Sequence, residues 1–199
     1  MTSLILASTS TTRQQMLRDA GIEFESCAPA VDEAALKSQL VKQGADGRVL
    51  AETLAEAKAK AVSVQNPSAL VIGADQILVI EDNILLDKAE SPELARAQLK
   101  ILSGKGHRLI SAVVVAAAGV PVWRHVGIAQ LLVRPLSDAF IDDYVAKHWA
   151  DIRHSVGCYQ IEGPGAQLFS RVEGDYFDIL GLPLLPLLNF LRERNIIIS

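Results

Sequence analysis

The pattern of apolar and polar positions in the first third of the chain predicts a short strand followed by helices. The apolar run at residues 3–7 reads as a buried strand, and the polar residues after it lead into a helix that Ser10 caps and Gly21 ends. Residues 48–64 carry leucine and alanine side chains on one stripe at helical spacing, which predicts a longer amphipathic helix. This part of the chain is therefore expected to place helices against a buried strand.

The remaining pattern predicts hairpins and further helices. An apolar strand run at 69–80 leads into a turn at 81–83, and Ser91 caps the next helix, which Gly104 closes. The segments that follow are expected to be strands at 107–118 and 122–134, a helix at 137–148, strands at 155–162 and 167–173, and a helix from Pro183. Strands alternate with helices and hairpins, which is typical of an α/β fold with a mixed sheet.

The length and composition fit a single domain. With 199 residues, of which 50% are hydrophobic, the chain can form one domain at 1–199 with one or two lobes. Aromatic residues make up only 5%, so the core is expected to be aliphatic. The net charge of -4 arises from interspersed acids and bases, whereas a nucleic-acid-binding protein needs a basic face. We therefore expect no nucleic-acid partner.

The cysteines and the apolar runs set further limits. Cys27 and Cys158 are far apart and form no C-x-x-C pair, so neither a zinc site nor a disulfide framework is indicated. No apolar run reaches the roughly 20 residues of a membrane helix, and the N-terminus has no signal-peptide pattern. The expectation is a soluble, cytoplasmic protein that has no membrane partner.

One carboxylate interrupts the apolar run at 69–80. Asp75 follows Gly73 there, and because an unpaired buried charge is costly, such an acid needs a partner, a metal or an exposed position in a cleft. The spacing fits equally well with a turn between two short strands, which would leave Asp75 and Gln76 on the surface. From the pattern alone both alternatives stay open.

Three further charged residues are candidates for the same site. Glu33 is a second carboxylate, and two carboxylates that converge on a cation would suit Mg²⁺. Lys58 falls just beside the apolar stripe of residues 48–64, so it can reach into a cleft or extend along the surface, and periodicity favours the surface. Lys88 is by itself an ordinary surface lysine. The four histidines lack the spacing of metal ligands and read as packing or surface residues.

The turn after the first strand carries five hydroxyl residues and an arginine. A helix N-terminus presents free N–H groups and a partial positive charge, and Arg13 adds a full one. Such a turn suits a phosphate group. Taken alone, an ordinary capped turn between a strand and a helix is the more frequent explanation.

Several short motifs follow one another in a fixed order. They are A-S-T-S-T-T-R at 7–13, V-D-E at 31–33, L-A-E-A-K-A at 54–59, G-A-D-Q at 73–76, L-S-G-K-G-H at 102–107, I-E-G at 161–163, V-E-G at 172–174 and G-L-P at 181–183. In this order, over nearly the whole chain, they resemble the Maf family of nucleoside triphosphate pyrophosphatases. No single motif is specific, but the ordered set is.

The resemblance implies a fold and a reaction. The fold is one elongated α/β domain of two lobes, with a mixed central sheet flanked by helices, and it allows a homodimer. The reaction is hydrolysis of a nucleoside triphosphate between its α and β phosphates, which gives a monophosphate and pyrophosphate. It requires a divalent metal, Mg²⁺ or Mn²⁺.

The resemblance also implies roles for the candidate residues. Asp75 would be the general base or a metal ligand, and Glu33 would be a second ligand. Lys58 and Lys88 would complete the catalytic set by neutralising charge as the anhydride breaks. The residues expected to cradle the triphosphate are Ser8, Ser10 and Arg13.

Two departures from the family pattern concern charge. Thr11-Thr12-Arg13 stands where the family has P-R-R, so one expected cation is absent. Asp87-Lys88-Ala89 stands where it has G-K-P, which places an acid beside the lysine. The expected catalytic set is retained, so activity is expected.

Three positions match residues that look like the family's substrate determinants, namely Thr12, Gln76 and Glu162. The branch that acts on dTTP and UTP tends to carry Arg, Thr and Gln there, whereas the 7-methyl-GTP branch carries Gln and Glu at the last two. A carboxylate only accepts hydrogen bonds and guanine offers N1–H and N2–H₂, so Glu162 favours a purine. Against this, the 7-methyl-GTP branch usually has Trp at the first position, which could stack on the base.

Two other functions stay open. A dTTP or UTP pyrophosphatase would keep the chemistry and change the base. A non-catalytic nucleotide-binding regulator of cell division would explain the altered motifs, since family members have been linked to septum formation. The retained Asp75 and Glu33 count against a pure binder, which has no need of a base.

Overall fold

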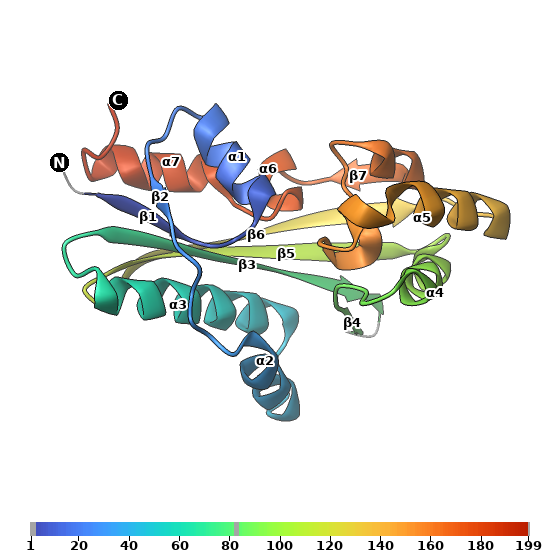
Figure 1. The fold of residues 1–199 in the computed structure, drawn as a ribbon, viewed down its shortest axis with the longest axis horizontal. Coiled ribbons are helices and arrows are strands. Elements are labelled where there is room, and N and C mark those ends of the chain that lie inside the picture. The colour runs from blue at the N-terminus through green and yellow to red at the C-terminus, as the bar shows by residue number, and fades with distance from the viewer. Residues whose placement is uncertain (1–2, 82–83, 199) are drawn as a thin grey trace.

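Within residues 3–81 and 84–198, which the computed structural model describes, seven strands form one mixed sheet along the length of the molecule (Figure 1). The strands are β1 (Leu4–Ala7), β2 (Glu25–Ser26), β3 (Leu70–Ile80), β4 (Leu85–Leu86), β5 (Gly106–Ala117), β6 (Val120–Val133) and β7 (Phe169–Glu173). Their order is β2-β1-β3-β5-β6-β7, and β4 pairs with β3. The β2-β1-β3 pairs are parallel and the others antiparallel, so the mixed α/β sheet is confirmed.

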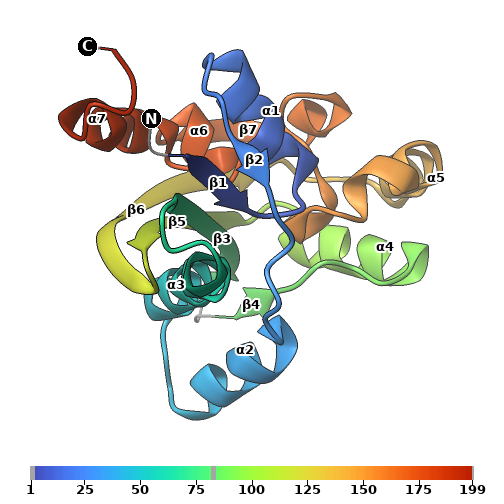
Figure 2. The same cartoon turned by 60° about the vertical axis from the view of Figure 1, so that its left-hand side comes forward.

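Helices cover both faces of this sheet. They are α1 (Thr11–Asp19), α2 (Glu33–Lys42), α3 (Gly47–Gln65), α4 (Pro92–Leu102), α5 (Asp138–Ile152), α6 (Tyr176–Ile179) and α7 (Leu184–Glu193), with short 3₁₀ turns at Val156–Cys158 and Pro164–Leu168. Helix α3 lies along one face and α2 projects beyond it (Figures 1 and 2). The other face carries α1, α6 and α7 at one end and α4 and α5 at the other. No helix in the described residues is long and apolar enough to cross a membrane.

Three of the four hydrophobic clusters in the described residues hold these layers together, and two of them define two lobes. The first-lobe core joins Leu6 of β1 and Leu17 of α1 to Leu187 of α7. The second-lobe core lies at the other end of the same sheet face, where Leu99 of α4 and Ile141 of α5 meet the ends of β3, β5 and β6. A third cluster packs α3 against the opposite face of β3 and β5. The strands β3, β5 and β6 run through both lobes.

The edge of β3 is open between two paired stretches. Strand β1 pairs with β3 from Leu70 to Gly73, and β4 pairs with it only at Leu78 and Val79. Residues 74–77, between these stretches, have no strand partner on this edge among the described residues. The chain from β2 to α2 crosses this edge from one face of the sheet to the other (Figures 1 and 2).

Helix starts were the most predictable local features. The expected caps Ser10, Ser91 and Ser137 accept backbone N–H bonds at the starts of α1, α4 and α5, and Asp32 and Asp46 cap α2 and α3 in the same way. The predicted strands at 107–118 and 122–134 are β5 and β6. The pattern did not reveal α2, β2 or α6, which are short or expose most of their side chains.

One strand prediction needs correction, and one open alternative is decided. Residues 155–162 form no strand, because Gly157 and Cys158 have φ angles of 75° and 57° and fold the chain into a 3₁₀ turn. The run at 69–80 forms a single strand that pairs with β5 at every residue from Leu70 to Ile80, so Asp75 lies within a strand and not on a surface turn. Of the turn expected at 81–83, residues 82–83 lie outside the described part of the chain.

Candidate active site

A buried lysine joins two carboxylates at the open edge of β3. The Nζ atom of Lys58 lies 2.7 Å from Oδ1 of Asp75 and 2.7 Å from Oε2 of Glu33. Lys58 is only 6% exposed and Asp75 8% exposed, whereas the Glu33 side chain is half exposed. The surface position that periodicity favoured for Lys58 is therefore wrong: the buried stripe of α3 includes this residue, and its charge is compensated by both acids.

Close packing of α3 against β3 sets this geometry. A Cβ atom placed on Gly73 would lie 2.2 Å from the backbone oxygen of Ala55 and 2.9 Å from the Cβ of Ala59. Only glycine permits that approach, which brings Lys58, on the same helix, to Asp75, two residues further along the strand. Gly73 therefore acts here through the space it leaves for the helix backbone.

Glu33 reaches the same lysine from a third element. It is the first residue of α2, whose N-cap is Asp32, and its acidic side chain suits the positive end of that helix. The three charged groups thus come from α2, α3 and β3, and they converge only in the folded chain.

The turn between β1 and α1 is held by its own hydroxyls. The Oγ atom of Ser8 accepts the Ser10 N–H at 3.1 Å, and the Oγ atom of Ser10 accepts the Arg13 N–H at 3.4 Å. The Nε–H group of Arg13 donates to the backbone oxygen of Gly181 at 2.7 Å, which ties α1 to the segment between α6 and α7. Burial lowers the pKa of the Arg13 guanidinium, and the carboxylates of Asp75 and Glu33 counteract it. Arg13 is therefore electrostatically part of the same cluster.

Lys88 approaches this cluster from the far side of the open edge. Partial burial lowers the pKa of its ammonium group, and the cations Arg13 and Lys58 lower it further. The neighbouring acid, Asp87, forms an ion pair with Lys37 of α2. Asp87 thus pairs with Lys37, although it stands beside Lys88 in the sequence.

Gln76 is fixed by three acceptors behind the site. Its Nε2 group lies 3.0 Å from Oγ of Ser111, 3.0 Å from the backbone oxygen of Asp178 and 2.9 Å from that of Ile179. Both amide protons are therefore used within the protein. What Gln76 can offer to a ligand is its Oε1 atom, a hydrogen-bond acceptor.

Thr12 and Glu162 line a cavity of about 630 Å³ beside the α1 turn. The walls come from α1, residues 160–162, α6 and the start of α7, and apolar side chains such as Met16 and Leu184 contribute to them. A volume of this size, with apolar walls and a few polar groups, is typical of a small-molecule site. The structure therefore brings two of the three expected substrate determinants to one cavity, while Gln76 lies nearer Asp75.

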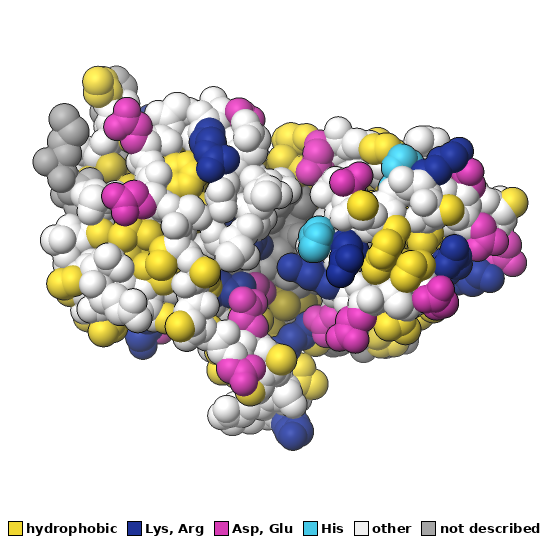
Figure 3. Space-filling view, viewed as in Figure 1, with side chains coloured by type: hydrophobic (Ala, Val, Ile, Leu, Met, Phe, Trp, Pro, Cys, Tyr) yellow, Lys and Arg dark blue, Asp and Glu magenta, His cyan; other side chains and the backbone are white. Residues whose placement is uncertain are grey.

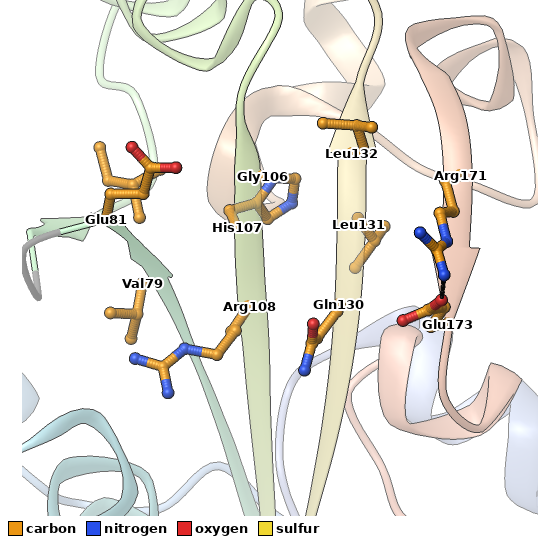
Figure 4. A pocket seen from close by; sticks show the side chains of 11 residues that line it. Val79, Glu81, Gly106, His107, Arg108, Gln130, Leu131, Leu132, Arg171 and Glu173 are labelled. Atoms are coloured by element: carbon orange, nitrogen blue, oxygen red, sulfur yellow. Dashed lines mark ion pairs between the residues drawn. The ribbon is translucent and has the colours of Figure 1, made fainter.

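A second hollow lies at the far ends of β3, β5, β6 and β7 and holds none of the expected residues (Figure 4). Arg108 and Gln130 occupy paired positions of β5 and β6 there, and Arg171 forms an ion pair with Glu173 (Figure 4). This hollow is separate from the Asp75 cluster. His107, one of its lining residues, is otherwise a packing residue whose Nε2 lies 2.7 Å from the Tyr159 hydroxyl.

The surface between the lobes is hollowed and charged. Figure 3 shows a depression between the two halves of the molecule, with basic side chains and acidic side chains at its lower margin. Among the described residues, no group of three or more His, Cys, Asp and Glu side chains converges as a complete metal site. The two carboxylates at Lys58 are the donors that such a site could use.

The sequence is similar to known proteins over nearly its whole length. A family model described as "Maf-like protein" matches residues 3–194. The chain belongs to the Maf family. A "Nucleoside triphosphate pyrophosphatase" of Sphingopyxis alaskensis is 52% identical over 98% of both chains. A protein of Brucella abortus named "7-methyl-GTP pyrophosphatase" is 48% identical over 98% of this chain and 97% of its own.

Some residues of the site lacked a sequence signal. Ser111 lies in an unbroken apolar strand pattern, and only its bond to the Asp178 backbone oxygen, at 2.6 Å, reveals its connection to Gln76. Asp178 belongs to the short helix α6, which has too few residues for a periodic pattern. In a Maf protein of this sequence, the family motifs mark the charged cluster but only part of the framework behind it.

Proposed function

We propose that this Maf protein hydrolyses nucleoside triphosphates between the α and β phosphates and releases a nucleoside monophosphate and pyrophosphate. The observation that carries the proposal is the Asp75–Lys58–Glu33 cluster, which adjoins the cationic turn at Ser10 and Arg13. The names of its relatives support the same reaction.

The cations of the site are suited to bind and neutralise the triphosphate. Arg13 and Lys88 both interact electrostatically with Asp75 and Glu33, and the first turn of α1 adds the N–H groups that Ser10 does not cap. In phosphoryl transfer, most of the catalytic effect comes from positioning and from stabilising charge on the leaving oxygen atoms. Ser8 and Ser10 keep the turn in the shape that this binding requires.

Asp75 is the proposed general base. A water molecule that attacks the α-phosphorus gives its proton to the Asp75 carboxylate, while the bond to the bridging oxygen breaks and pyrophosphate departs. Lys58 holds the carboxylate in place through its Oδ1 atom, so the other oxygen is available to the water. Lys58 therefore orients the base as well as compensating its charge.

The residues also fit a divalent cation. Asp75 and Glu33 are hard oxygen donors, and Mg²⁺ typically uses one or two carboxylates together with phosphate oxygens and water. When bound there, Mg²⁺ or Mn²⁺ would neutralise the phosphates and acidify water. Glu33 has one oxygen on Lys58 and a second that is left for the cation, whereas a cation on Asp75 would take the oxygen that otherwise accepts the proton of the water, so the two roles of Asp75 are alternatives.

A purine is the proposed base. Glu162 lines the cavity beside α1 and can accept from adjacent N–H groups of guanine, and Gln76 presents an acceptor oxygen nearer the phosphates. Two acceptors without a matching donor suit guanine better than a pyrimidine edge. The candidate substrates are therefore GTP and 7-methyl-GTP.

The test is pyrophosphate release by the purified protein with Mg²⁺ or Mn²⁺ from 7-methyl-GTP, GTP, dTTP, UTP and CTP. We expect the purines to be preferred, and we expect Asp75→Asn to lose turnover but keep its fold. Glu56→Gln, a partly exposed residue of α3 that pairs with Lys60 and Arg124 and not with the cluster, serves as the matched control. Preference for dTTP or UTP would refute the purine assignment alone. Saturable binding without product would instead favour a nucleotide-binding regulator.

A further inference from the structure

The cavity beside α1 differs in charge from the cluster that it adjoins. Among the described side chains that line it, two are carboxylates, Asp19 and Glu162, and none is a lysine or an arginine. The neighbouring cluster, in contrast, contains Arg13, Lys58 and Lys88. A ligand that spans both regions therefore has one strongly anionic end and one end that is neutral or positive.

An aromatic side chain is exposed in the same cavity. Tyr176, the first residue of α6, is 49% exposed, whereas every other Phe, Trp or Tyr side chain in the described residues is buried or only partly exposed. Its ring contacts Phe177 edge-on, with centroids 5.9 Å apart and planes inclined at 67°. Tyr176 therefore presents an exposed aromatic surface to a cavity whose other walls combine Phe177 with aliphatic, amide and acidic groups.

We propose that Tyr176 is the residue that stacks on the nucleobase in this cavity and that its ring, together with Asp19 and Glu162, sets the preference for a positively charged base, such as a purine alkylated at N7. This inference rests on the proposed function, because it needs the triphosphate to lie at the Arg13 cluster. Alkylation at N7 gives the purine ring a formal positive charge, and an aromatic face attracts such a cation more strongly than a neutral ring. The negative charges of Asp19 and Glu162 also attract such a cation.

The exposed Tyr176 ring also bears on the absence of an aromatic side chain at Thr12. That residue stands in the first turn of α1, lines the cavity and provides no aromatic surface. Tyr176, from the other end of the chain, supplies one within the same cavity.

The expected effect follows from the strength of such contacts. A cation above an aromatic ring gains a factor of about 2 to 30 in affinity, depending on how well water is excluded. We expect the wild-type protein to bind 7-methyl-GMP at least 5-fold more tightly than GMP. Because the two ligands differ only in the methyl group and its charge, the ratio of their Kd values isolates this effect.

The experiment measures that ratio by isothermal titration calorimetry with the full chain. Tyr176→Leu keeps apolar bulk and removes the ring, so we expect the ratio to fall to below 2, mainly through weaker 7-methyl-GMP binding. Tyr176→Phe should keep the ratio. Ile128→Ala, which removes an exposed apolar side chain from β6, is the control and should also keep it.

Each outcome decides. A wild-type ratio near 1, a Tyr176→Leu ratio equal to that of the wild type, or equal losses for both nucleotides would overturn the inference. Because binding is measured without turnover, a protein that binds with the expected ratio and yet releases no pyrophosphate would contradict the proposed function and leave this inference standing. Pyrophosphate release together with equal Kd values for the two nucleotides would support the proposed function and overturn this inference.

Discussion

Replacing Asp178 with asparagine should stabilise the protein at neutral and alkaline pH but not in acid. The Asp178 carboxyl lies directly over the backbone of Gly127, because a Cβ atom on Gly127 would be 2.1 Å from Oδ2 of Asp178. Asp178 is only 8% exposed. Burial raises the pKa of this carboxyl from 3.8 to about 6, and the negative charge of Asp175 adds to the effect. The folded protein therefore pays an electrostatic cost whenever Asp178 is ionised.

The size and sign of the effect follow from linkage. The folded carboxyl keeps its proton at pH values where the unfolded chain has lost it, so this contribution to stability is complete below pH 3.8 and is lost as the pH rises through about 6. The difference between the two pKa values converts to about 3 kcal/mol. Asparagine stays neutral and keeps the backbone oxygen that Gln76 and Ser111 bind. The gain should therefore be near zero at pH 4 and about 2–3 kcal/mol at pH 8.

Urea unfolding at a series of pH values measures this gain. His107, whose burial lowers its pKa to about 4, also makes stability depend on pH, but it is common to both proteins and cancels in the difference. Asp151→Asn, at an exposed position, controls for the loss of one negative charge. A gain that is the same at pH 4 and pH 8, or a loss at pH 8, would refute the reasoning.

Three further changes test the framework of the site. Lys58→Met leaves two carboxylates without their shared cation and should cost about 3 kcal/mol in unfolding free energy and abolish pyrophosphate release; an unchanged urea midpoint would contradict the pairing. Ser111→Ala removes one acceptor from Gln76 and should cost about 1 kcal/mol in unfolding free energy by the same assay. An unchanged urea midpoint would show that the hydroxyl makes no net contribution. Gly73→Ala forces a Cβ against the backbone oxygen of Ala55, so we expect a loss of about 3 kcal/mol and reduced turnover; a thermal melt equal to that of the wild type would argue against the close packing.

The sequence predicted the charged residues of the cluster better than their burial and the elements that surround them. Asp75 was identified because a carboxylate within an apolar strand is costly, and that local signal survives without knowledge of the fold. The burial of Lys58 was predicted wrongly from periodicity, since its counter-charges come from α2 and β3, elements that the helical pattern of α3 does not contain. Pairing between distant elements is a property of the fold.

The shorter elements show a second limit. Helix α2 has no buried residue, so its apolar pattern is weak, and it is defined mainly by the Asp32 cap. The segment at 155–162 has the alternation of a strand, yet Gly157 and Cys158 adopt positive φ angles there. For Gly157 this is inexpensive, but for Cys158 it is imposed by tertiary packing, which one sequence does not reveal.

The continuity of the long strands has a consequence for how the enzyme handles its substrate. Strand β3 pairs with β5 at every residue from Leu70 to Ile80, and β5 continues alongside β6 with one register shift at Val115–Ala116, so the two lobes share one ladder of hydrogen bonds. Swinging one lobe towards the other would bend that ladder, unlike the closure of domains joined by a loop. The cleft should therefore receive nucleotides largely preformed, and exchange of substrate and product should depend on side chains at its rim, such as Lys88, moving within nanoseconds.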